Sequence, residues 1–103
     1  MSWPKDDRDR AERAWFHEQT LVLKRSLRGS TISGHRSPER NVKVGGYPHS
    51  LHLLDLAEDI RFSSRARKQE AKRMARDLNL HWNDSKPGSL ALHVQARPAK
   101  PKA

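Results

Sequence analysis

The chain has 103 residues, of which 34% are hydrophobic, and it carries a formal net charge of +9 with a pI near 10.7. This length fits a single domain with a thin core, because compact domains cluster at about 100–150 residues. No cysteine is present, which excludes a disulfide and leaves a metal held by histidine and carboxylate as the means of cross-linking so small a fold. The N-terminal segment is charged where a signal peptide is apolar, and no stretch reaches the ~18 apolar residues of a membrane span. We therefore expect a protein made in the cytoplasm without an export signal.

The positive charge predicts attraction to polyanions. Nucleic acid is one such partner, and anionic cell-wall polymers and lipopolysaccharide are others. Charge alone does not distinguish these partners.

Two elements are expected in the N-terminal part, followed by a long loop. Residues 5–28 predict a helix, because the apolar positions Ala11, Ala14, Trp15, Leu21 and Val22 follow a helical period. Gly29 is expected to end this helix, and residues 30–33 to form a short strand. Residues 34–50 contain three glycines and two prolines, which predicts a loop, with one helical turn starting at 37–39.

The C-terminal half predicts a strand at 56–60, a helix at 63–80 capped by Ser63 or Ser64, and a β-hairpin that turns at 85–88. The basic positions of the helix predict an ordinary solvated face. Residues 1–96 are expected to form one domain, and 97–103 a disordered basic tail. The expected fold class is α+β: a small antiparallel sheet with helices packed on one side and a site at the sheet edge.

Three side chains in this pattern suit a metal ion. His52 and Asp59 flank a turn that leads into a predicted strand, and His93 lies on the second strand of the hairpin. Zinc is commonly bound by imidazole and carboxylate, with three protein ligands plus water at catalytic sites. From spacing alone, a hydrogen-bonded core histidine remains the alternative for His93.

The segment SGHRSPERNVKVGGYPHSLHLLDLAED resembles the signature of the zinc-dependent peptidoglycan peptidases. This group includes D-alanyl-D-alanine carboxypeptidases and phage endolysins that cut the L-alanyl-D-glutamate bond. The matching positions are Ser33, Gly34, His35, Arg36, Ser37, Pro38, Asn41, Gly45, Gly46, Ser50, His52, Ala57 and Asp59. The later segment LHVQ, at 92–95, resembles the strand that supplies the last metal histidine of the family.

The resemblance implies a Hedgehog/DD-peptidase-like fold and a zinc ion held by His52, Asp59 and His93. It implies that Arg36 binds a carboxylate or carbonyl of the peptidoglycan stem peptide, a role that suits a planar, permanently charged guanidinium. Ser50 is implied as a second polar contact to substrate. The structural alternatives are an ion pair of Arg36 with Glu39 or Asp55, and a turn-capping role for Ser50.

Two positions depart from the family pattern. Asp55 stands where the family has glycine, and is expected to bring a negative side chain near the site. Leu90 stands where the family has a catalytic acid, and loss of a general base costs about 10²–10⁴-fold in rate.

Asp84 is our candidate for the replacement base. A two- or four-residue hairpin turn would place Asp84 and Trp82 on the same sheet face as His93. The alternative for Asp84 is a turn residue. Glu58 is expected to point to the opposite face from Asp59; the other candidates for proton transfer are His35, His49 and His81.

The favoured function is a zinc metallopeptidase that cuts the peptidoglycan stem peptide, acting as a monomer of phage or bacterial origin on the cell wall after release. The first alternative is a catalytically impaired, zinc-containing module that binds wall peptides or has a structural role in a phage particle. The second alternative is a nucleic-acid-binding protein that uses a basic stripe at Arg65, Lys68, Lys72, Arg73 and Arg76.

Overall fold

The structure is a computed structural model, and it describes residues 7–34, 37–43 and 51–97. Its elements are, in chain order, α1 (Asp7–Leu27), β1 (Ser30–Ser33), α2 (Pro38–Lys43), the 3₁₀ helix η1 (Leu51–Leu54), β2 (Ala57–Arg61), α3 (Arg65–Asp77), β3 (His81–Asn83) and β4 (Ala91–Gln95). The predicted helices and strands are all present. The helical turn expected at 37–39 extends into a six-residue helix, and η1 was not predicted.

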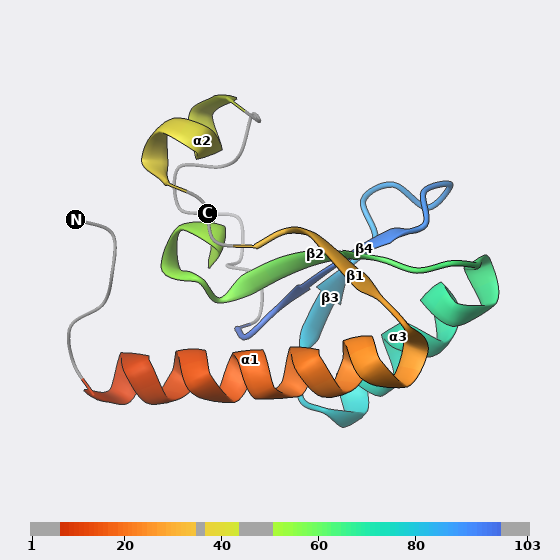
Figure 1. The fold of residues 1–103 in the computed structure, drawn as a ribbon, viewed down its shortest axis with the longest axis horizontal. Helices are drawn as coiled ribbons and strands as arrows, with labels where there is room; N and C mark the ends of the chain where they lie inside the picture. The colour runs from red at the N-terminus through yellow and green to blue at the C-terminus, as the bar shows by residue number, and fades with distance from the viewer. Residues whose placement is uncertain (1–6, 35–36, 44–50, 98–103) are drawn as a thin grey trace, which may run out of the picture.

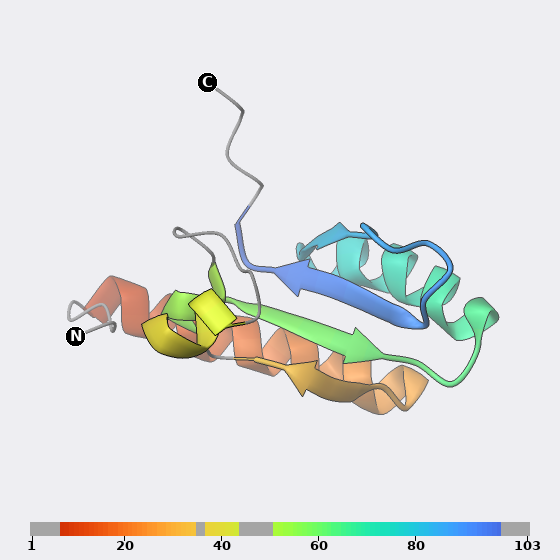
Figure 2. The ribbon, with the colours of Figure 1, turned by 90° about the horizontal axis from the view of Figure 1, so that it is seen from above.

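The four strands form one antiparallel sheet in the order β1-β2-β4-β3. Figure 1 shows α1 and α3 on one side of this sheet and α2 on the other. Seen from above in Figure 2, β2 and β4 run side by side through the middle, with β1 at one edge and β3 at the other. The predicted α+β class, with an antiparallel sheet and flanking helices, is confirmed.

The strand register sorts the side chains of the sheet into two faces. Ile60 pairs with Leu92 across β2 and β4, and both side chains are buried toward the helices. Asp59 pairs with His93 in the same two strands, so these side chains point to the opposite face. Asn83 of β3 lies across from His93 and belongs to that second face as well. The face away from α1 and α3 therefore carries polar side chains along its middle.

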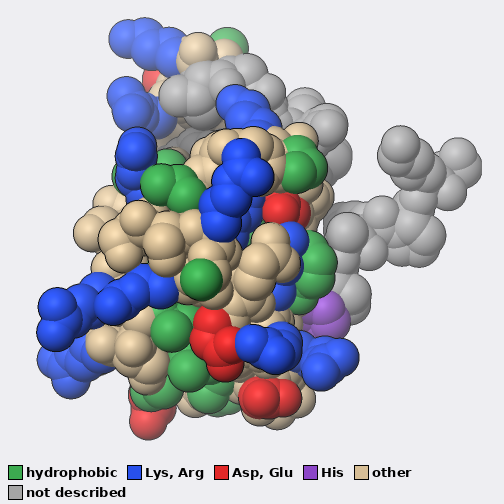
Figure 3. Space-filling view, turned by 90° about the vertical axis from the view of Figure 1, so that its right-hand side faces the viewer, with side chains coloured by type: hydrophobic (Ala, Val, Ile, Leu, Met, Phe, Trp, Pro, Cys, Tyr) green, Lys and Arg blue, Asp and Glu red, His purple; other side chains and the backbone are tan. Residues whose placement is uncertain are grey.

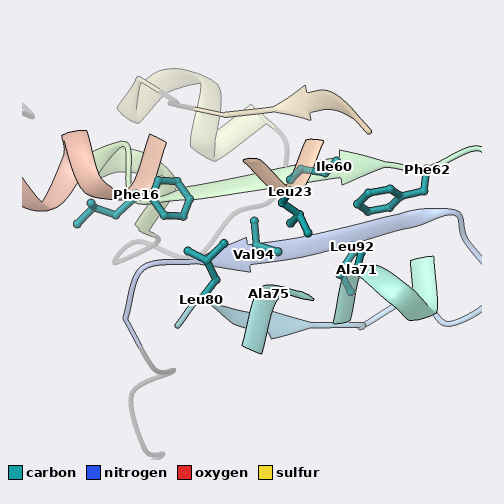
Figure 4. Packing of buried hydrophobic residues seen from close by; sticks show 10 residues of the cluster. Phe16, Leu23, Ile60, Phe62, Ala71, Ala75, Leu80, Leu92 and Val94 are labelled. Carbon is teal, nitrogen blue, oxygen red and sulfur yellow. The ribbon is translucent and has the colours of Figure 1, made fainter. Parts of the chain in front are cut away.

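The hydrophobic core lies between the sheet and the two long helices, as Figure 4 shows. Its buried members are Phe16, Leu23, Leu56, Ile60, Phe62, Ala71, Ala75, Leu80, Leu92 and Val94. Small alanines on α3 let this helix approach the sheet closely, while α1 contributes the larger side chains. Burying each large side chain stabilises the fold by about 1.5–3 kcal/mol.

The end of α1 differs in detail from the prediction that Gly29 terminates the helix. The left-handed residue is Arg28, with φ 55°, and the Gly29 amide then donates to the carbonyl of Lys24. Gly29 is needed for a different reason. A Cβ at this position would lie 2.7 Å from Ile60 Cγ2 and 2.8 Å from a ring carbon of Phe62. Close packing against the core, and not a positive φ, therefore requires glycine there.

Helix α3 begins as predicted, with the Ser64 hydroxyl accepting from the amide of Arg67 at 3.2 Å. The prediction of a wholly solvated basic face is wrong at Lys68, whose side chain is 1% exposed. Its ammonium donates to the carbonyl of Ser89 at 2.5 Å and to that of Lys86 at 3.3 Å. Lys68 thus holds the β3–β4 connection against α3.

The β3–β4 connection runs from Asp84 to Leu90, which is longer than the predicted turn. The carbonyl of Leu90 accepts from the Phe62 amide at 3.0 Å, which fixes the start of β4 beside the end of β2.

Arg97, expected at the start of a disordered tail, binds both carboxylate oxygens of Glu12 through its guanidinium. Over the described residues, no helix has the length and apolar character needed to cross a membrane.

Candidate metal centre

Three separate elements bring together His52, Asp59 and His93. His52 comes from η1, Asp59 from β2 and His93 from β4. One ligand-type atom from each lies within 4.8 Å of the others. The group sits on the two middle strands, on the face turned away from α1 and α3. The prediction of a site at the sheet edge is therefore wrong in position, because β4 and not β3 is the neighbour of β2.

The carboxylate of Asp59 lies between the two imidazoles. Its Oδ1 is 2.9 Å from Nδ1 of His93, and its Oδ2 is 3.4 Å from Nε2 of His52. The two rings are 5.2 Å apart between centroids and inclined by 61°. His52 is buried, at 2% exposure, while the other two are half-buried, which leaves one side of the group accessible.

The outer nitrogen of each imidazole faces an oxygen that can only accept. Nδ1 of His52 lies 2.7 Å from the carbonyl oxygen of Gly34. Nε2 of His93 lies 2.7 Å from Oε1 of Gln95, whose amide nitrogen donates to the carbonyl of Arg97 at 2.6 Å. Both outer nitrogens must therefore be the protonated ones.

A neutral imidazole carries one proton, so the inner nitrogens of both rings then present lone pairs. These lone pairs face the Asp59 carboxylate, which is also an acceptor. A cation between these three side chains would bind both lone pairs and the carboxylate at once. The donor set fits zinc, which favours imidazole nitrogen and carboxylate oxygen.

The carboxyl of Asp59 stays ionised in this setting. Partial burial raises the pKa of Asp59, but when both imidazoles are protonated their hydrogen bonds and charges outweigh this and hold the pKa well below its usual range. An ionised carboxylate is the form that binds a metal.

Gln95 is expected to control metal affinity although it is not a ligand. In Gln95→Leu, the Nε2–H of His93 loses its acceptor, so ring orientation and tautomer are no longer fixed, and zinc affinity should fall about 10–100-fold. Gln95→Glu is the matched control, because it keeps an acceptor oxygen and should retain affinity. Competition with a chromophoric chelator measures both. Equal affinities in the leucine variant and wild type would contradict the role of Gln95.

Asp55 does not point into the metal group, contrary to the prediction. Its backbone φ is 58°, in the left-handed region that favours glycine. Its carboxylate turns to α1, where Oδ2 lies 2.6 Å from Nε2 of His17. The aspartate thus combines a strained backbone with a contact that ties η1 to α1.

We expect Asp55→Ala to lower the free energy of unfolding by about 1–2 kcal/mol, because it keeps the strained φ and loses the His17 contact. Asp55→Gly loses the same contact but relieves the strain, so it should cost distinctly less. Urea denaturation of the two variants beside wild type measures the difference. Equal losses in both would show that backbone strain plays no part.

The structure does not bring Asp84 to the metal group. Asn83 pairs with His93, so Trp82 and Asp84 belong to the opposite sheet face, and the predicted shared face is wrong. The Asp84 carboxylate lies 2.7 Å from the ammonium of Lys68 and 2.8 Å from that of Lys72. The hydrogen bonds from these two lysines lower the pKa of Asp84. Asp84 is therefore an ion-pair partner of α3, and the role of catalytic base is withdrawn.

Glu58 points away from Asp59, as predicted. It is buried on the α1 side, where its carboxylate accepts from Thr20, Lys24 and Thr31 at 3.1, 3.0 and 2.6 Å. Burial raises the pKa of Glu58, but these hydrogen bonds and the Lys24 charge lower it overall. Asp55, Glu58 and Asp84, the three acids nearest in sequence to the ligands, are thus all engaged elsewhere.

Several predicted site residues lie outside the described residues, namely Arg36, Ser50, His35, His49, Gly45 and Gly46. Their predicted roles, and the ion-pair and turn-cap alternatives, stay predictions. His81 is described, and it pairs with Gln95 on the sheet face that carries His93. The sequence analysis did not predict that Gln95 contacts His93. The spacing could have indicated it, because Gln95 stands two residues after His93 on a strand and therefore lies on the same sheet face.

Comparison with known protein families gives a match to the segment that contains His52 and Asp59. The model of a family described as Peptidase M15 matches residues 26–85. Neither the curated proteins nor the solved structures gave a match. The matched segment contains His52 and Asp59, while His93 lies beyond it and joins the group through the β2–β4 pairing.

Proposed function

The chain belongs to the Peptidase M15 family, whose members are metallopeptidases of peptidoglycan, and on this premise we propose that it binds one zinc ion and hydrolyses a peptide bond of the stem peptide. The proposed ligands are His52, Asp59 and His93. The proposed site of action is the cell wall, reached after release from the cell in which the protein is made.

The convergence of three acceptors carries this proposal. Two lone-pair nitrogens and one carboxylate oxygen within 4.8 Å of one another form a good ligand set for a zinc ion. Gly34 and Gln95 hold the outer nitrogens in the tautomers that a metal requires.

A zinc ion held by His52, Asp59 and His93 would supply a Lewis acid and an activated water. The protein residues supply the rest: Asp59 and the two histidines fix ligand geometry, and the sheet beneath them keeps that geometry rigid. Arg36 and Ser50 are the proposed contacts to the substrate. The position of the general base in the family is occupied by Leu90.

One observation favours a second candidate function, a zinc-containing module that binds wall peptides without cutting them. Leu90 cannot accept a proton, and Asp55, Glu58 and Asp84 all have other partners in the structure. A module of this kind would keep the zinc site and lack peptide release.

The nucleic-acid alternative receives less support from the geometry. Within the proposed basic stripe, Lys68 and Lys72 bind Asp84, and Arg73 binds Glu70. Figure 3 shows Lys and Arg side chains at several separate places on this face, with acidic side chains beside some of them. Scattered charge of this kind suits general attraction to an anionic wall better than a nucleic-acid groove.

The deciding experiment measures zinc content and stem-peptide release on the same preparation. Purified peptidoglycan is incubated with the zinc-loaded protein, with and without a chelator, and products are identified by mass spectrometry. The peptidase proposal predicts one zinc per chain and release that stops with the chelator. One zinc without release favours the binding module, and release that persists without metal overturns both.

A further inference from the structure

A hollow of about 580 Å³ lies against β3, outside the group of metal ligands. It is lined by side chains from the end of α3 and from β3 and β4, among them Arg76, Leu80, Trp82, Asn83 and Gln95. Gln95 connects the hollow to the metal centre, because its Oε1 lies 2.7 Å from Nε2 of His93. The hollow therefore ends one side chain away from a metal ligand.

The strand beside the hollow is open for pairing. β3 stands at the end of the strand order, and its three residues are all exposed. No strand in the described part of the chain pairs with its outer side. An extended peptide can add to such an edge through main-chain hydrogen bonds, while pockets beside it select side chains.

The register places the edge strand in line with the proposed metal ligands. Asn83 pairs with His93, and His93 in turn pairs with Asp59, so the three lie in one row across the sheet. The amide of Asn83 thus lies between the hollow and the ligands. It can donate to a peptide carbonyl and accept from a peptide N–H.

The charge of the lining suits an acidic ligand. Asp84, the acidic residue of the lining, is matched by the ammonium groups of Lys68 and Lys72. Arg76 has no ion-pair partner among the described residues and is exposed in the last turn of α3. A guanidinium in this position is suited to bind a carboxylate through two parallel hydrogen bonds.

The hollow also offers apolar contact. Trp82 is 43% exposed, and the ammonium of Lys72 lies 4.9 Å from the centroid of its ring. This cation–π contact fixes the indole in place. Trp82 therefore gives the hollow an apolar wall, which can hold the short alkyl side chain of an alanine next to a charged one.

We propose that this hollow is a substrate subsite, in which an extended acidic peptide lies along the edge of β3 with a carboxylate on Arg76 and its main chain beside Asn83. The inference rests on the proposed function for the identity of the peptide, the peptidoglycan stem. Its geometry is independent of whether the peptide is cut.

The test is binding of a synthetic stem tetrapeptide to the zinc-loaded protein, measured by calorimetry and by chemical shifts of the Trp82 indole and the Asn83 side-chain amide. Arg76→Ala should weaken binding about 10–100-fold without changing zinc affinity. Arg65→Ala is the matched control, because it removes an exposed arginine from the start of the same helix. A peptide with amidated carboxylates should bind wild type as weakly as the acidic peptide binds Arg76→Ala.

Several results would overturn the subsite. These are no measurable binding to wild type, equal binding by Arg76→Ala and wild type, or binding that leaves the Trp82 and Asn83 signals unmoved. The outcome is separable from that of the proposed function. Binding at β3 without cleavage supports the subsite and contradicts the peptidase, while cleavage with a KM unchanged in Arg76→Ala supports the peptidase and contradicts the subsite.

Discussion

Replacing His93 with alanine should abolish stoichiometric zinc binding and reduce stem-peptide cleavage at least about 10³-fold. The ligand set would fall to one imidazole and one carboxylate, and the loss of metal removes several kcal/mol of transition-state stabilisation. Metal analysis by mass spectrometry and a peptide-release assay measure the two effects. His52→Ala should behave in the same way.

His81→Ala is the matched control for this prediction, because it removes an exposed histidine from the same sheet face without touching the ligand set. It should retain one zinc per chain. Full zinc retention in His93→Ala would refute His93 as the third ligand. His93 would then be a hydrogen-bonded residue of the strand, which is the alternative given above.

Lys68→Met should lower the free energy of unfolding by about 3–5 kcal/mol, with a fall in Tm of more than about 10 °C. The variant removes a buried ammonium that lies 2.7 Å from Asp84 and donates to backbone carbonyls of the β3–β4 connection. Asp84, whose side chain is 9% exposed, would keep only Lys72 as its partner. Thermal and urea denaturation measure the loss.

Lys72→Met provides the comparison, since Lys72 is more exposed and makes one ion pair with the same carboxylate. Its cost should be about 1 kcal/mol or less. Zinc affinity should be unchanged in both variants, because neither lysine is near the ligands. A Lys68→Met protein within about 1 kcal/mol of wild type would contradict the structural role of this ion pair.

The grouping of His52, Asp59 and His93 could be predicted from sequence because short-range and long-range patterns agreed. His52 and Asp59 fall in one recognisable motif, and His93 lies on a strand whose alternation places it beside Asp59 once β2 and β4 pair. The fold class followed from the same alternation and from the apolar period of the two long helices. In the two long helices and the strands, the local sequence pattern and the tertiary packing favour the same secondary structure.

Asp84 shows why the proposed base could not be predicted. A hairpin face assignment depends on whether the connection has an odd or even number of residues, and one residue reverses it. The connection from Asp84 to Leu90 is set by the buried ammonium of Lys68, which binds carbonyls inside it. Nothing in the helical pattern of α3 marks that lysine as buried, since lysine is rarely found inside proteins.

Asp55 and Gln95 show a similar limit at single positions. The sequence marks Asp55 as a replacement for glycine, but not that its side chain turns toward His17. Gln95 owes its role to a hydrogen bond whose orientation is fixed by the carbonyl of Arg97. Roles of this kind depend on side-chain directions that a one-dimensional pattern does not contain.

The most direct test of the metal centre is nitrogen NMR of the zinc-loaded protein with ¹⁵N-labelled histidine. The account predicts metal on Nε2 of His52 and on Nδ1 of His93, with protons on the nitrogens that face Gly34 and Gln95. The chelator should reverse both signals. Zinc binding that leaves these two rings unshifted, or that occupies the opposite nitrogen in either, would contradict the account.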